Sequence, residues 1–106
     1  MYKIVALWGA PKPSDVEAFE KHYAETHVPL ARKVPYLKRL VLTRADGGLE
    51  GAPAPFYRVA ELLFDAPEAL HRASESAQWR AMREDAGKMI ERFGVTLQAA
   101  MGWERD

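Results

Sequence analysis

The sequence predicts an α+β fold in which four β-strands and three helices form one domain. Apolar segments rich in β-branched and aromatic residues occur at four places, and helical periodicity fills the gaps between them. Stretches rich in glycine and proline punctuate these segments. A chain of 106 residues is long enough for one hydrophobic core and too short for two. We therefore expect residues 1–106 to form a single domain.

The four predicted strands cover residues 2–8, 37–43, 56–64 and 95–103. The first ends where Gly9 is followed by two prolines within four residues. Between the second and third strands, residues 45–55 contain three glycines and two prolines. This composition is typical of a loop.

The first helix is predicted to begin at Ser14, which forms a capping box with Glu17. Apolar and aromatic residues then recur on one helical stripe: Val16, Phe19, Tyr23 and His27. Pro29 disfavours the helical conformation at the residue before it, so the helix is expected to stop near His27.

Two further helices are expected before the last strand. Asp65 is the predicted N-cap of a short helix that ends near residue 73, and Ser76 is the predicted N-cap of a longer one. Gly94 is suited to end the longer helix in the left-handed conformation. Gly87 lies inside it, either tolerated there or leaving room for a neighbour or a ligand. The apolar stripe of the longer helix consists of Trp79, Met82, Ala86, Met89, Ile90 and Phe93.

The order β-α-β-β-α-α-β is the ferredoxin-like arrangement, a βαββαβ unit with helices on one face of a four-stranded antiparallel sheet. Both alternating sets of strand residues are apolar; in the first strand Ile4 and Trp8 belong to one set and Val5 and Leu7 to the other. Helices on one face can bury only one set. We therefore expect a homodimer in which two sheets pack face to face across a two-fold axis.

Composition excludes several classes of function. Fifteen basic residues balance fifteen acidic ones and are scattered, so nucleic-acid binding is not expected. Without cysteine the chain has no disulfide, thiolate nucleophile or Cys-ligated zinc. The apolar run at the N-terminus is too short to span a membrane and lacks a signal-peptide cleavage pattern, so a cytoplasmic location is the default expectation.

Three short motifs lie along the chain: Phe19…His22-Tyr23…His27-x-Pro29-Leu30, Lys33-x-Pro35 after it, and Ser76-x-x-Trp79 at the last helix. Together with the βαββαβ order, these motifs resemble those of the EthD family. The resemblance covers nearly the whole chain and implies a dimeric α/β barrel built from ferredoxin-like protomers. The family is named for a role in the degradation of ethyl tert-butyl ether alongside a cytochrome P450 system. Related barrels include cyclases, dehydratases, isomerases and small monooxygenases, so the resemblance implies the fold more strongly than the reaction.

His27 and Tyr23 are the candidate catalytic residues. His27 shares the buried stripe, where burial opposes its protonation while a helix C-terminus would favour it, and such an imidazole can act as general acid or base. Tyr23 could donate a hydrogen bond to a substrate oxygen or orient His27. The alternative interpretations are a histidine that caps the helix and a core tyrosine.

The candidate ligand-binding residues are Phe19, His22, Tyr57 and Trp79. His22 lies about 100° from the stripe on an α-helix and is expected to be more exposed. The rings of His22 and His27 would point about 140° apart, which is poor geometry for a shared metal, so no metal site is predicted. His71, on a short polar helix, is expected at the surface.

Two classes of function remain open from the sequence. In the first, the protein is a cofactor-free enzyme that binds a small hydrophobic carbonyl or phenolic compound, and His27 moves a proton. In the second, it is a non-enzymatic carrier or accessory protein for a partner oxidase. The resemblance also includes a haem-binding variant of the superfamily, in which His27 would be the axial ligand. No nucleotide or phosphate motif is present, so no cofactor is predicted.

Overall fold

The computed structural model describes all 106 residues and has the predicted ferredoxin-like topology. Its four strands are β1 (Tyr2–Trp8), β2 (Arg39–Arg44), β3 (Arg58–Phe64) and β4 (Leu97–Trp103). They form one antiparallel sheet in the order β2-β3-β1-β4, with β1 and β3 in the centre. The last three strands are each shorter at the N-terminal end than predicted.

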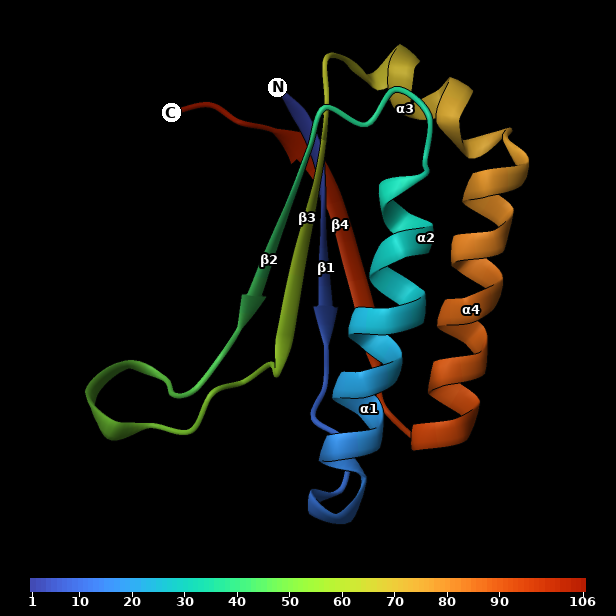
Figure 1. Ribbon diagram of the computed structural model, residues 1–106. Coiled ribbons are helices and arrows are strands. Elements are labelled where there is room, and N and C mark those ends of the chain that lie inside the picture. Colours follow the sequence, from blue (N-terminus) through green and yellow to red (C-terminus); the bar gives the residue numbers. More distant parts are fainter.

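The helices form a single layer on one face of this sheet (Figure 1). The chain runs through α1 (Val16–His22), a π-helical turn η2 (Tyr23–His27) and α2 (Val28–Arg32) without interruption. After β3, the short α3 (Pro67–Ser74) leads to the long α4 (Ala77–Phe93), which packs beside α2. None of these helices has the length and hydrophobicity that a membrane span requires.

The pairing register decides which residues of the sheet face the helices. Ile4 and Trp8 are buried beneath the helices, and Ala6 lies between them on the same face. Val5 and Leu7 point to the opposite face, which no helix covers, and both are only half-buried. That bare face is not wholly apolar, because Lys3 and Glu61 form an ion pair of 2.8 Å on it.

Two helix starts differ from the predictions. The chain turns first in a short 3-10 segment (Pro13–Asp15), and Ser14 makes no capping hydrogen bond. The proline at the beginning of this segment fixes φ near its helical value and starts the turn early. Asp65 is likewise not a cap: α3 has Ala66 as its N-cap residue and begins with Pro67, whose missing N–H needs no partner there.

The helix does not end near His27 as predicted, but continues to Arg32. Within η2 the N–H of Val28 bonds to the carbonyl of Tyr23, five residues back, so the turn is wider than an α-helical one. Pro29 then occupies the first turn of α2, where its missing N–H is tolerated. The proline is therefore accommodated by a π-helical turn and does not terminate the helix.

Other local predictions are confirmed. The Ser76 hydroxyl accepts a hydrogen bond of 3.1 Å from the N–H of Trp79, and Gly94 ends α4 with φ of 64°. Gly87 has open space where a side chain would begin, so it leaves room for no neighbour. The segment between β2 and β3 is a long loop with one 3-10 turn, and it projects away from the sheet (Figure 1).

Candidate active site

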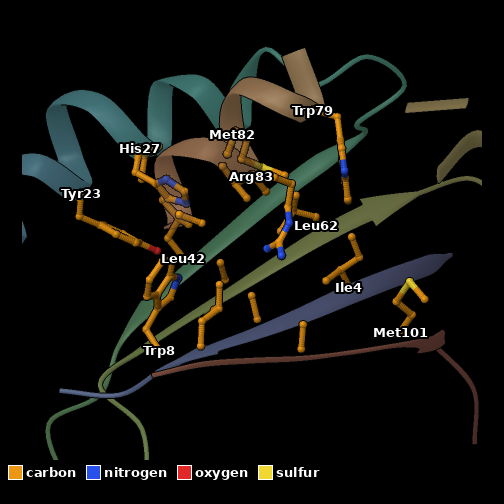
Figure 2. A pocket seen from close by; sticks show the side chains of 18 of the residues that line it. Ile4, Trp8, Tyr23, His27, Leu42, Leu62, Trp79, Met82, Arg83 and Met101 are labelled. Carbon is orange, nitrogen blue, oxygen red and sulfur yellow. The ribbon is translucent and has the colours of Figure 1, made fainter. Parts of the chain in front are cut away.

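An apolar cavity of about 360 Å³ lies between the helix layer and the sheet. Members of both clusters of core residues line it, among them Ile4 from one cluster and Trp8 from the other. Of its 19 lining residues, 17 are hydrophobic, and the two others are His27 and Arg83. Figure 2 shows both side chains above the sheet, together with Trp8, Tyr23, Trp79 and Met82. The size and lining are those of a site for a small, largely apolar ligand.

His27 is held by a buried carboxylate on the neighbouring helix. Its Nδ1 lies 2.8 Å from Oδ2 of Asp85, a residue of α4 that is 7% exposed. The Nε2 atom of His22 lies 3.0 Å from each oxygen of the same carboxylate. One acid therefore bridges two imidazole rings, and the three side chains tie η2 and the end of α1 to α4.

The π-helical turn explains how both histidines reach one carboxylate. His22 and His27 are five residues apart and would diverge on a regular α-helix. In η2 the hydrogen bond itself spans five residues, so positions five apart come close to the same face. The expectation of an exposed, diverging His22 was wrong for this reason: its side chain is only 20% exposed and points at Asp85.

This arrangement selects one tautomer of His27. An ionised carboxylate only accepts hydrogen bonds, so Nδ1 of His27 must donate to Asp85. Burial lowers the pKa of His27, while the hydrogen bond and charge of Asp85 raise it and the charges of His22 and Arg83 lower it, so that the pKa lies below its ordinary value. At neutral pH the ring is therefore uncharged, and its Nε2 carries a lone pair.

Because the chain continues to Arg32, His27 is not at a helix end and caps no terminal carbonyl. The alternative interpretation of this histidine as a helix cap is thereby excluded. Its ring instead packs edge-on against Trp8, with centroids 5.5 Å apart.

Tyr23 lines the cavity one helical turn before His27, and their ring centroids are 6.0 Å apart. Its ring stacks on Phe19, and the Arg58 guanidinium lies 4.7 Å from its centre. Burial raises the pKa of Tyr23 above its ordinary value, against a smaller lowering by the Arg58 charge, so the hydroxyl keeps its proton. That hydroxyl makes none of the side-chain hydrogen bonds within the protein, which leaves it free to donate one to a ligand.

The four predicted ligand-binding residues occupy different places. Trp79 lines the cavity, whereas His22 lies behind its wall, bonded to Asp85. Phe19 is completely buried in the core beneath Tyr23 and does not reach the cavity. Tyr57 packs edge-on against Phe19, also outside the cavity.

Tyr57 belongs to a second polar cluster at the end of the sheet. The Arg58 guanidinium donates two hydrogen bonds to the carboxylate of Glu20, and Arg44 lies 3.6 Å from the same carboxylate. The Tyr57 hydroxyl is buried there without a hydrogen bond of good geometry. Burial and then the nearby charge of Glu20 raise the pKa of Tyr57. The carboxylate of Glu20 on α1 thus holds two guanidinium groups, and its hydrogen bonds to Arg58 join α1 to β3.

Sequence reasoning missed Asp85. A signal was nevertheless present, because Asp85 falls between Met82, Ala86 and Met89 on the apolar stripe of α4. An acid at a buried helical position needs a partner, which here comes from residues about 60 positions earlier in the chain.

Residues 12–92 match the sequence model of the EthD domain. A protein of Rhodococcus erythropolis, described as an uncharacterized 11.0 kDa protein in the thcB-thcC intergenic region, is 30% identical over 97 residues. That match covers 92% of this chain and 90% of the relative.

Solved structures agree with this match. A crystal structure of an EthD-family protein of Bacillus halodurans superimposes with a TM-score of 0.85, at 34% identity and 99% coverage of both chains. A putative antibiotic biosynthesis monooxygenase of Nitrosomonas europaea gives a TM-score of 0.61 at 16% identity, covering 99% of this chain and 100% of the other. The second likeness shows that the fold is shared with monooxygenase-type proteins.

Proposed function

This chain belongs to the EthD family, and on that premise we propose that it binds a hydrophobic small molecule in the cavity and moves a proton on it without a cofactor. The observation that carries the proposal is the hydrogen bond between buried Asp85 and His27 at the wall of that cavity. A role in oxidative or catabolic degradation of a xenobiotic agrees with the family.

The His27–Asp85 pair has the properties of a general base. Asp85 fixes the ring orientation and leaves Nε2 unprotonated. It also stabilises the imidazolium that forms when Nε2 takes up a proton. His22 donates to the same carboxylate and so holds it in place. The free base is thus oriented before any ligand arrives.

The proposed step is the removal of a proton from a carbon next to a carbonyl group, or from a phenol. The bonding electron pair stays on the ligand as an enolate or phenolate, and the proton moves to Nε2 of His27. Return of that proton to another ligand atom completes an isomerisation, and to a leaving oxygen an elimination. In this proposal Tyr23, which lines the same cavity, donates a hydrogen bond to the ligand oxygen.

We further propose that the protein is a homodimer formed through the bare face of the sheet. Half-buried Val5, Leu7, Val41 and Val59 lie there with no helix over them, and two sheets packed face to face would remove them from water.

Exchange of ligand protons for deuterium tests the proton-transfer proposal. The bicyclic ketone 2-tetralone is incubated with the protein in D₂O, and loss of its α-proton signals is followed by NMR. Wild type should accelerate the exchange, whereas His27→Gln should give only the background rate, because an amide forms hydrogen bonds but neither takes up nor releases a proton at neutral pH. His71→Gln, at the exposed histidine paired with Glu75, is the matched control and should exchange as fast as wild type.

The same samples distinguish the alternatives. Binding of 2-tetralone without any acceleration by wild type would refute the catalytic proposal and favour a carrier that serves a partner oxidase. A Soret band on addition of haem, lost in His27→Gln, would instead support an axial-ligand role for this histidine.

A further inference from the structure

Arg83 is the one permanently charged side chain in the wall of an otherwise apolar cavity. It projects from α4 towards the sheet, between Met82 and Leu62 (Figure 2). The cavity contains no carboxylate to neutralise it, and none of the ion pairs in the protein includes Arg83.

Other arginines of the same helix have partners. Arg80 donates to the carbonyl of Glu75 at 3.0 Å, and Arg92 lies over the ring of Phe93. The positions three and four residues from Arg83 hold tryptophan, arginine, alanine and glycine, so its own helix offers it no acid. Its guanidinium is left with five N–H donors that only solvent or a ligand can satisfy.

Arg83 is an exposed residue at the wall of the cavity, so water hydrates its guanidinium when no ligand is bound. A purely apolar ligand offers no hydrogen-bond acceptor in place of any water that it displaces there. A ligand oxygen that carries negative charge would accept its hydrogen bonds, and a carboxylate would do so through two at once. We infer that the cavity selects an apolar ligand bearing one anionic oxygen group, and that Arg83 binds this group.

The inference rests on the proposed function, because it names the ligand class of the same cavity, and it adds an electrostatic role. Proton removal by His27 leaves an enolate or phenolate, and a cation in the same wall stabilises the oxyanion as it forms. Arg83 thus binds negative charge on the ligand, and His27 accepts the proton.

Calorimetric titration with two probes of equal shape tests this inference. The probes are 2-naphthoate, which is anionic at pH 8, and 2-naphthamide, which is neutral. Wild type should bind 2-naphthoate about tenfold or more tightly than 2-naphthamide, as expected for hydrogen bonds to a charged group. Arg83→Gln should weaken only 2-naphthoate and abolish the preference, and Arg83→Lys should keep part of it.

Arg80→Gln is the matched control. Arg80 lies one helical turn before Arg83 and outside the cavity wall, so this variant removes the same charge from the same helix without changing the cavity. It should retain the preference. Equal affinity for 2-naphthoate in the Arg83→Gln and Arg80→Gln proteins would overturn the inference.

Two further outcomes separate this inference from the proposed function. Equal binding of both probes by wild type overturns the role of Arg83 and leaves the apolar cavity intact as a binding site. Failure of both probes to bind overturns the cavity proposal and this inference with it.

Discussion

Asp85→Asn tests the central feature of the candidate site, because it keeps the size of the side chain and removes its charge. Asp85 accepts contacts of 2.8, 3.0 and 3.0 Å from two imidazole rings. An amide has one oxygen to accept a hydrogen bond, and its NH₂ group faces the other ring as a second donor. One of the two rings therefore loses its partner. A hydrogen bond to a charged group contributes about 1.5–3 kcal/mol, and relief from burying the charge offsets part of it, so we expect a net loss of about 1–2 kcal/mol of stability.

The substitution should also change the pH dependence of stability in a defined direction. The folded-state pKa of His27 is already below its ordinary value of 6.5, so the unfolded chain takes up a proton first as pH falls. Stability is then fully present above about pH 6.5 and declines as pH falls towards the folded pKa. Asp85 raises that pKa, so its removal lowers it further. Each additional unit adds about 1.4 kcal/mol to the loss at acid pH.

Two measurements check these expectations. NMR titration of the imidazole signals gives the pKa of His27. Urea denaturation gives the free energy of unfolding, and it is measured from about pH 5 to about pH 8, which is about 1.5 units on either side of the ordinary histidine pKa. Exchange of 2-tetralone protons should slow on the order of a hundredfold or more, because the imidazolium loses its counter-charge. Glu84→Gln, which removes an exposed acid next along the same helix, should change none of these. An unchanged or raised His27 pKa in Asp85→Asn would refute the electrostatic coupling on which the mechanism depends.

Two predictions concern assembly and the backbone. Val5→Lys places a charge on the bare face of the sheet, beside Glu61, and light scattering should show the mass falling from about twice 12.0 kDa to that of one chain. The control Ala24→Lys, on the exposed helix surface, should remain dimeric. A dimer that survives Val5→Lys contradicts the proposed interface. Gly87→Ala should raise the free energy of unfolding by about 0.5–1 kcal/mol, because its new methyl group meets nothing within 4 Å. Gly94→Ala should lower it by about 1–2 kcal/mol, because φ there is 64°. A less stable Gly87→Ala than Gly94→Ala protein in urea denaturation would show that α4 is not built as described.

The sequence alone was sufficient for the architecture, because that depends on local patterns. Strand propensity and helical periodicity gave the element order, the hydroxyl of Ser76 marked the start of α4, and Gly94 marked its end. The stripe that contains Tyr23 and His27 correctly placed both side chains under the helix layer. These features follow from spacing within a few residues, which one sequence displays directly.

The tertiary structure decided how the candidate site is assembled. Helical periodicity assumes about 100° per residue, so it cannot foresee the wider turn that brings His22 and His27 to one carboxylate. Such a turn gains little by itself, and here its contacts with Asp85 on a neighbouring helix stabilise it. The position of Arg83 in the cavity wall has the same origin, because it depends on how α4 packs over the sheet. The place of Asp85 on the apolar stripe of α4 indicates that this acid needs a partner, but only packing decides which residues, some 60 positions away, supply it.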